Sequence, residues 1–323
     1  MVGALIAAGI AALLYHLGIG LPAFLIPLQV VRVRRGTGPF LLAAALALVA
    51  IAGVRIALVG GELTGAALPF LLLELAVVLG MLAGLAWIQL PELLGAAGRL
   101  RLPGGRVVRL LLATAVVGLA SVPMFRYLDG SQAFNAGLQQ LFEAATAVLN
   151  RLLDPTEGQA TLRAREVGAM ARAVFLRSYL LDYLLVLTFC WWVGSVLGAR
   201  SLGRRPDIAP LAAFKPSEWL IWPLIAGLAL VLLGLVTPIG PLELAGWNLM
   251  LVMLFVYGLA GLGILRFLLE RFGAPRSMRM LAWIALVVMV FVPGANAAVA
   301  VLLAGLGVSE TWLNYRKTER SKA

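Results

Sequence analysis

Three polar residues lie inside long apolar stretches and are the first candidates for chemistry: Glu74, Asp182 and Asn248. Glu74 is about eight residues into its stretch, which is about 12 Å along a helix and near the middle of a bilayer if that helix spans one. An ionised carboxylate there costs at least about 2.5 kcal/mol, so it must face a partner or a cavity, or be protonated. Glu74 therefore either binds a solute or a proton, or hydrogen-bonds another helix as a neutral acid.

Asp182 and Asn248 lie closer to the ends of their apolar stretches. Asp182 is one turn or so inside, with Arg177 five positions before it, so the two either anchor a span at the interface or contribute to a site. Asn248 begins a stretch, where its side chain either caps a helix or lines a site. We take Glu74, Asp182 and Asn248 as the predicted solute-binding residues. Arg55, near the end of another stretch, is expected to extend its guanidinium to the interface.

The sequence contains no combination of residues that indicates a reaction. His16 is the only histidine and Cys190 the only cysteine, so neither has a second residue of its kind for a metal site. The sequence also lacks the phosphate-binding loop of ATPases and the motifs of zinc peptidases and serine hydrolases. We therefore expect no catalytic residues, no metal and no cofactor, and we do not expect an enzyme.

The composition indicates the environment in which these residues act. Hydrophobic residues make up 62% of the chain and charged residues 13%, against about half and about a quarter in soluble proteins. The net charge of +11 is carried by short loops between apolar blocks, which is typical of cytoplasmic loops and argues against nucleic-acid binding. The blocks are continuously apolar, so they predict helices and not strands. The predicted fold is all-α, a polytopic transmembrane helical bundle in the lipid bilayer.

Six blocks are long enough to cross a bilayer once: 40–59, 66–90, 107–124, 179–197, 219–236 and 247–265. Basic loops follow alternate blocks, so all of them lie on one side, which the positive-inside rule assigns to the cytoplasm. Block 2–31 breaks at Gly18–Pro22 and is either one span with an interfacial piece or a hairpin of two short halves. Block 280–306 breaks at Pro293–Gly294, and a hairpin there keeps the basic C-terminus cytoplasmic.

The segment from Arg126 to Arg177 is the one long stretch too polar for lipid. Its apolar residues recur at steps of three and four, which predicts an amphipathic helix ending near Leu153; they are Phe134, Leu138, Leu141, Ala145, Val148 and Leu152. Asp154–Glu157 has the features of a new helix start, and this second helix runs on into block 179–197. The pair either lies on the membrane surface or over the bundle, or forms a lid over a substrate site.

These observations divide the chain into three parts. They are an N-terminal transmembrane half (1–125), an extracytoplasmic amphipathic helical insert (126–177) and a C-terminal transmembrane half with a basic tail (178–323).

Several motifs resemble those of one family. They are the aromatic and proline-containing run Phe214–Pro223, the segments Trp247–Leu249 and Tyr257–Gly261, the ending Gly305–Lys317, and, near the N-terminus, Pro22, Pro27 and Arg34–Gly36. In these motifs the chain resembles the YybS-like bacterial multi-pass membrane proteins, a family of unknown function. That family is distantly similar to the S components of energy-coupling-factor transporters. The resemblance implies an inner-membrane protein that binds a small solute from outside, while partner subunits supply ATPase activity.

Two classes of function follow. A solute-binding or transport component requires a polar cavity open to the outside, lined by Glu74 with Asp182 and Asn248, and roofed by the insert. A non-transporting scaffold or regulator of envelope assembly requires a well-packed bundle without a cavity, and an insert that presents an apolar stripe to a protein partner. We favour the first class. A Glu74 sealed among apolar side chains, with no connected void, would exclude it.

Overall fold

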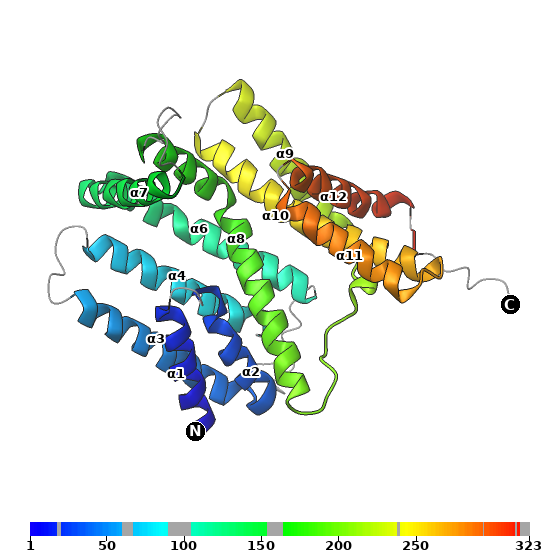
Figure 1. Cartoon of the computed structure of the whole chain (residues 1–323), viewed down its shortest axis with the longest axis horizontal. Helices are drawn as coiled ribbons and strands as arrows, with labels where there is room; N and C mark the ends of the chain where they lie inside the picture. Colours follow the sequence, from blue (N-terminus) through cyan, green and yellow to red (C-terminus); the bar gives the residue numbers. More distant parts are fainter. Residues whose placement is uncertain are drawn as a thin grey trace. The chain divides into compact units, whose positions relative to one another are not determined.

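The computed structural model describes residues 1–17, 21–59, 67–89, 105–153, 164–237, 240–292, 294–313 and 315–316. These residues form eleven α-helices and three short 3₁₀ helices, with no strand among them, which confirms the all-α prediction (Figure 1). A helix satisfies its backbone hydrogen bonds internally, as a segment in lipid must. The chain divides into two compact units: Met1–Leu176 with Asp182–Asp207, and Arg177–Leu181 with Ile208–Ala323.

The described part of the first unit contains seven α-helices. They are α1 (Val2–His16), α2 (Leu25–Arg35), α3 (Thr37–Val59), α4 (Ala67–Ile88), α6 (Arg106–Gly130), α7 (Gln132–Leu153) and α8 (Ala164–Arg200). The 3₁₀ helix Leu21–Phe24 precedes α2. One segment of α8, Arg177–Leu181, belongs by its contacts to the second unit.

The described part of the second unit contains four further α-helices. They are α9 (Ile221–Val236), α10 (Gly240–Arg271), α11 (Arg276–Phe291) and α12 (Ala295–Leu313). The 3₁₀ helices Leu211–Ala213 and Glu218–Leu220 precede α9. Within this unit α10 packs against both α9 and α12, and α11 packs against α12.

Seven of the described helices are long and apolar enough to span a membrane. Six of them, α3, α4, α6, α8, α9 and α10, coincide with the six predicted blocks, and the seventh is α12 in the C-terminal block. With 37 and 32 residues, α8 and α10 exceed the roughly 20 residues that cross a bilayer. Both helices must therefore tilt or extend beyond the hydrocarbon region.

The N-terminal block is a hairpin of two short helices. In the first unit α1 packs against both α2 and α3. A Cβ atom added to Gly3, near the start of α1, would collide with the guanidinium of Arg35, at the end of α2. The start of α1 thus lies beside the end of α2, so the two helices are antiparallel. Of the predicted break Gly18–Pro22, residues 18–20 lie outside the described residues, and Leu21 and Pro22 begin the 3₁₀ helix before α2.

Two arginine-containing connectors of the first unit meet at the same end of the helices. Arg106, at the start of α6, forms an ion pair of 2.7 Å with Asp207, which follows the end of α8. This contact agrees with the prediction that the basic loops before block 107–124 and after block 179–197 share one side. Arg99 and Arg101, which belong to the first of these predicted loops, lie outside the described residues.

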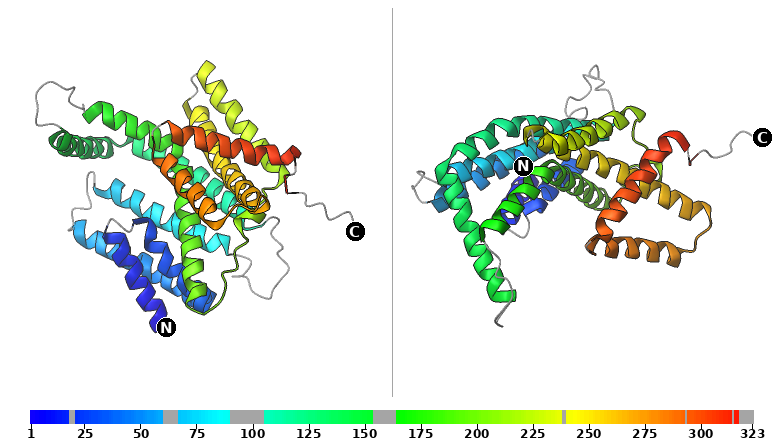
Figure 2. Two further views of the ribbon diagram at one scale, coloured as in Figure 1. Left: turned by 45° about the vertical axis from the view of Figure 1, so that its right-hand side comes forward. Right: turned by 90° about the horizontal axis from the view of Figure 1, so that it is seen from above.

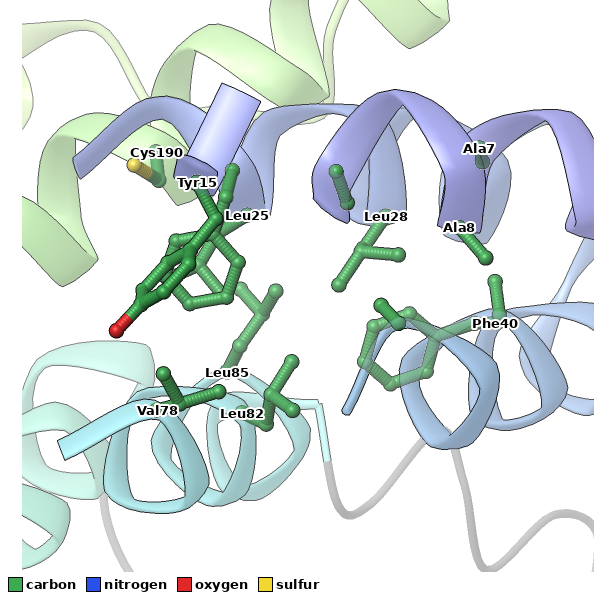
Figure 3. Close-up of a cluster of buried hydrophobic side chains, with 14 of the residues drawn as sticks. Ala7, Ala8, Tyr15, Leu25, Leu28, Phe40, Val78, Leu82, Leu85 and Cys190 are labelled. Atoms are coloured by element: carbon green, nitrogen blue, oxygen red, sulfur yellow. The ribbon is translucent and has the colours of Figure 1, made fainter. Parts of the chain in front are cut away.

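Small residues on α1 allow the helices of the first unit to pack closely. Figure 3 shows Ala7 and Ala8 of α1 facing Phe40 of α3, with Leu28 of α2 beside them. Leu85 of α4 is also fully buried in this cluster. Small side chains at the helix contacts let large ones interdigitate, and in lipid such packing, rather than exclusion of water, holds helices together.

In the second unit, two glycines bring the backbones of α10 and α12 into direct contact (Figure 2). A Cβ atom on Gly261 of α10 would collide with the backbone of Leu303, and one on Gly307 of α12 with the backbone of Tyr257. No side chain separates the helices at these two points. Such close approaches are typical of small residues at helix contacts in membranes.

The C-terminal block is also a hairpin. It consists of α11 and α12, which pack against each other. Gly294, in the short connection, has a φ of +83°, a left-handed conformation that favours glycine. This confirms the predicted break at this point; Pro293 itself lies outside the described residues.

The predicted insert is formed by α7 and the first part of α8, and α8 continues without a break as predicted. The hydroxyl of Ser131 accepts a hydrogen bond from the Phe134 N–H (3.3 Å), an interaction typical of a helix start. The residues of the predicted apolar stripe on α7 differ in whether they are packed or exposed. Phe134 packs against Phe70 of α4 with ring centroids 4.7 Å apart, whereas Leu141 and Val148 are exposed. The predicted helix start at Asp154–Glu157 lies outside the described residues.

The glycine contact between α10 and α12 predicts a position-specific loss of stability. We expect Gly261→Leu to destabilise the protein by about 1–3 kcal/mol or more, because the added side chain must separate two backbones. Gly258, on the same helix, has no atom within 4 Å of an added Cβ, so Gly258→Leu is the matched control. The measurement is the thermal unfolding midpoint in detergent. An equal fall of the unfolding midpoint in Gly261→Leu and Gly258→Leu would contradict the close contact of α10 and α12 at Gly261.

The arrangement of α6 and α8 predicts the accessibility of their ends. In a Cys190→Ser background, Gln132→Cys lies beyond the far end of α6 and Ser201→Cys beyond the arginine-bearing end of α8; both positions are exposed. If the arginine-bearing end is cytoplasmic, a membrane-impermeant maleimide should label only Gln132→Cys in intact cells, and Ser201→Cys only after permeabilisation. Labelling of both positions in intact cells would be inconsistent with this topology.

Candidate functional site

Glu74 lies in a cluster of three polar side chains from three helices of the first unit. Its Oε1 accepts a hydrogen bond from the hydroxyl of Tyr15 on α1 at 2.6 Å. The same oxygen forms an ion pair of 2.6 Å with the guanidinium of Arg55 on α3. Arg55 also lies over the Tyr15 ring, with its Cζ 5.8 Å from the centroid. The charge on Glu74 is therefore compensated within the chain, as a carboxylate at membrane depth requires.

These contacts bear on the prediction that Glu74 binds a solute or a proton. Glu74 pairs with Arg55 and accepts a hydrogen bond from Tyr15, two partners that the sequence pattern does not reveal. Its side chain is 24% exposed, so it is not sealed among apolar side chains. Neither of the two cavities described below is lined by Glu74. Binding of a solute by Glu74 stays a prediction.

Asp182 and Asn248, the other two predicted site residues, have different surroundings. Asp182 is exposed on the part of α8 that belongs to the first unit. Asn248 is buried in the second unit, where its Oδ1 accepts a hydrogen bond from the Leu180 N–H (3.1 Å) and its Nδ2 donates one to the Leu244 carbonyl (3.0 Å). Both ends of this amide are thus occupied within the chain. The joint role of Glu74, Asp182 and Asn248 stays a prediction.

A second polar cluster in the first unit is not marked by any sequence motif. Gln89, just after α4, donates a hydrogen bond from Nε2 to Oε1 of Gln29 on α2 (2.6 Å). Gln29 in turn donates from Nε2 to the hydroxyl of Ser195 on α8 (2.9 Å). All three side chains are buried. The close approach of α2 to α8 depends on Gly194 and Gly198, where added Cβ atoms would collide with side-chain atoms of α2.

These three residues line a cavity of about 340 Å³ in the first unit. The cavity lies where α2, α4 and α8 end and α6 begins, at the end of the unit where the two connectors meet. Its charged lining residues are Arg32, Arg106, Arg204, Arg205 and Asp207. Because the glutamines and the serine are buried while Arg204 and Arg205 are exposed, the amides lie at the inner wall and these two arginines at the mouth.

The Arg106 side chain is held in place at this cavity by several contacts. Its two terminal nitrogens donate hydrogen bonds to the carbonyl and the carboxylate of Asp207, at 2.6 and 2.7 Å. Its guanidinium also lies over the ring of Trp191 on α8, with Cζ 5.8 Å from the ring centroid. Among the described residues that line the cavity, Asp207 is the only acidic one, and it is paired with Arg106. The cavity therefore carries excess positive charge and is suited to a polar ligand with negative charge.

A larger and more open cavity, of about 600 Å³, lies beside α10 and α11 in the second unit. Its walls are mostly apolar. Two of its three arginines, Arg266 and Arg279, lie 3.0 and 4.0 Å from the carboxylate of Glu270, so much of its charge is compensated. We therefore regard the smaller cavity of the first unit, with its buried amides, as the better candidate site.

The closing motif noted in the sequence has a structural role in the second unit. Glu310 of α12 is buried and pairs with Nε of Arg316 at 3.0 Å. The Arg316 guanidinium also donates hydrogen bonds to backbone carbonyls before α9 and on α10, those of Ala212, Phe214 and Ala260, at 2.8, 2.7 and 3.1 Å. This pair thus joins α12 to two other segments of the unit.

Comparison with known proteins identifies the family. Among the described residues, no group of three or more His, Cys, Asp or Glu side chains is placed to hold a metal ion, so the geometry alone does not indicate a metalloprotein. The family described as "Predicted membrane protein (DUF2232)" matches residues 5–306. The chain belongs to the DUF2232 family. No curated protein and no solved structure matches it.

Membership of DUF2232, together with the seven apolar helices, establishes a multi-pass membrane protein. The DUF2232 match includes the Glu74 cluster and the whole arginine-lined cavity, and it ends before Glu310 and Arg316. It supports a membrane protein of unknown function and gives no link to YybS-like proteins or to S components, so those resemblances stay predictions.

The Glu74–Arg55 contact can be measured by a double-mutant cycle. We expect Glu74→Leu and Arg55→Leu each to lower the free energy of unfolding, because each leaves a charge at membrane depth without its partner. The double variant should lose less free energy of unfolding than the two single variants together, and the difference, the coupling energy, should be about 0.5–3 kcal/mol. Arg55→Leu combined with Glu143→Leu, which changes an exposed carboxylate on α7, is the control and should be additive. Additivity of the Glu74 and Arg55 changes would contradict the pair.

Proposed function

We propose that this DUF2232 protein is a solute-binding or transport component of the bacterial inner membrane, with no enzymatic activity of its own. The observation that carries the proposal is the cavity of about 340 Å³ in the first unit, where the buried Gln29–Gln89–Ser195 network meets several arginines. Ligand sites in helical membrane proteins commonly lie between helices, where a few polar groups converge. Polar side chains inside a membrane-spanning bundle are energetically costly, so their presence there indicates a function.

The proposed site differs in position from the one predicted from the sequence. That prediction used Glu74, Asp182 and Asn248 and an opening to the outside. The cavity instead opens at the arginine-bearing end, which the positive-inside rule assigns to the cytoplasm together with the C-terminus. Glu74, about a third of the way along α4, and Gln89, just after its end, are about 22 Å apart along the helix axis. In this proposal the Glu74 cluster forms the outer part of a path along α4 and the cavity its inner part.

The resemblance to S components extends the proposal to partner subunits. In this version, separate membrane-associated subunits supply ATPase activity, because the sequence has no phosphate-binding loop. This extension is supported by the sequence motifs alone, since no solved structure matches the chain.

A second candidate function, a scaffold for envelope assembly, is favoured by the surface of α7 and α8. Large apolar side chains are exposed there: Leu141, Val148, Met170, Val174 and Phe175. Such a surface suits an insert that presents apolar side chains to a protein partner. The cavity of the first unit argues against the fully packed bundle that this function requires, so we place the scaffold second.

Purification in mild detergent tests the proposal and separates the two functions. We expect wild-type protein to retain a small molecule detectable by mass spectrometry, and Gln29→Leu to lose it at least about tenfold, because the inner wall loses its central amide. Gln139→Leu, at an exposed position of α7, is the matched control and should retain the ligand. A stable protein partner with no retained small molecule in any variant would favour the scaffold. Equal retention in Gln29→Leu and the control would contradict the cavity as the site.

A further inference from the structure

The chemistry of the cavity in the first unit specifies a class of ligand, an inference that rests on the function proposed above. We infer that the cavity binds the phosphate group of a small polyol phosphate, either as a free metabolite or as the headgroup of a lipid. Three features of the cavity support this assignment: its charge, a buried acceptor at its inner wall, and its size and position.

The charge of the lining favours an anion. Among the described residues, four arginines and one aspartate line the cavity, and the aspartate is paired with Arg106. The two exposed arginines at the mouth, Arg204 and Arg205, therefore add positive charge beyond that of the described acidic lining. Arginine binds phosphate with two parallel hydrogen bonds and remains charged at all physiological pH values. The phosphate monoester of a free metabolite carries about −1.5 to −2 charges at neutral pH, and the phosphodiester of a lipid headgroup carries one; both suit a lining with exposed arginines at its mouth.

The inner wall requires a hydrogen-bond donor from the ligand. The Oε1 atom of Gln89 is buried and accepts no hydrogen bond from the part of the chain that the structure describes. The amide nitrogen of the same side chain is already committed to Gln29 and to the Leu85 carbonyl. A buried acceptor without a partner costs about 1–3 kcal/mol. Because this oxygen has almost no accessible surface, the amide must turn toward the cavity before a ligand O–H group can reach it, and the hydrogen bond formed would offset this cost. A polyol hydroxyl meets this need, whereas a fully ionised anion without hydroxyl groups does not.

The size and position of the cavity fit a small phosphorylated polyol. A volume of about 340 Å³ exceeds that of a single inorganic ion and lies at the lower end of the range for organic ligands. Val33, Ile88 and Leu202 supply apolar wall for a carbon skeleton. Basic pockets between transmembrane helices on the cytoplasmic side are also where phospholipid headgroups bind. The two sources of the phosphate group therefore share one recognition chemistry.

The experiment compares two double variants with the same change in net charge. Arg204→Gln with Arg205→Gln removes two arginines from the mouth, and both positions are exposed, so folding should be preserved. Arg34→Gln with Arg200→Gln removes two exposed arginines that do not line the cavity. Full-length protein is used in each case, and the unfolding midpoint without ligand verifies that both variants fold.

Two probes distinguish the sources. The first is sn-glycerol 3-phosphate, titrated against protein in phosphatidylcholine nanodiscs. The second is phosphatidylglycerol, introduced into the same nanodiscs and counted by native mass spectrometry. At least one probe should bind the wild-type protein and the Arg34/Arg200 variant equally, and the Arg204/Arg205 variant at least about tenfold more weakly. Binding of sn-glycerol 3-phosphate would indicate that the ligand of the cavity is a soluble metabolite. Binding of phosphatidylglycerol alone would indicate that it is a lipid headgroup.

Two results would overturn the inference. One is that neither probe binds; the other is that binding falls equally in both double variants, which would indicate a general charge effect. Failure of the inference is distinguishable from failure of the proposed function. If the wild-type protein retains an uncharged or cationic molecule that Gln29→Leu loses, the cavity is a solute site but not a phosphate site. If no molecule depends on Gln29, the proposed function itself fails.

Discussion

In the interior of a bilayer there is no water to satisfy polar groups, so each must find its partner within the chain. Several polar side chains of the described structure follow this constraint. Glu74 is held by an ion pair and a hydroxyl, Asn248 uses both ends of its amide, and the buried Glu310 is paired with Arg316. The contacts of Glu74 and the hydrogen bond from Leu180 to Asn248 join helices that are distant in the sequence. Polar contacts therefore specify which helices are neighbours, while the apolar surfaces between them need only fit closely.

The cavity of the first unit is a place where this constraint is only partly met by the chain. Most of its polar atoms are satisfied in a directed series from Gln89 to Gln29 to Ser195, but one buried carbonyl oxygen of the series has no donor among the described residues. The arginines at the mouth add charge that the acidic groups among the described lining residues do not balance. The Glu74 cluster, farther along α4, pairs its acidic group with an arginine. The two clusters thus differ in how far the described chain itself completes their polar interactions.

The sequence predicted the helices and their breaks well, because apolar runs, basic loops and glycine or proline interruptions are local signals. The hairpin at Gly294 and the continuous α8 are examples. It did not predict which polar residues meet. Glu74 was recognised because a carboxylate in an apolar run stands out, but its partners lie on helices whose neighbourhood no local pattern encodes. Gln29 and Gln89 were missed because uncharged amides near helix ends are common, and only the approach of α2 to Gly194 of α8 makes them a network.

The direct backbone contact of α10 and α12 has a mechanical consequence for the second unit. Gly261 and Gly307 leave no side chain between the helices to repack, so neither helix can rotate or slide without breaking two contacts at once. Together with the Glu310–Arg316 pair, which ties the end of α12 to α10, they make these two helices a rigid body. By contrast α11 has no buried residue and is joined to α12 through a glycine in a left-handed conformation. Among the described helices of this unit, α11 therefore loses the least packing in a hinge movement.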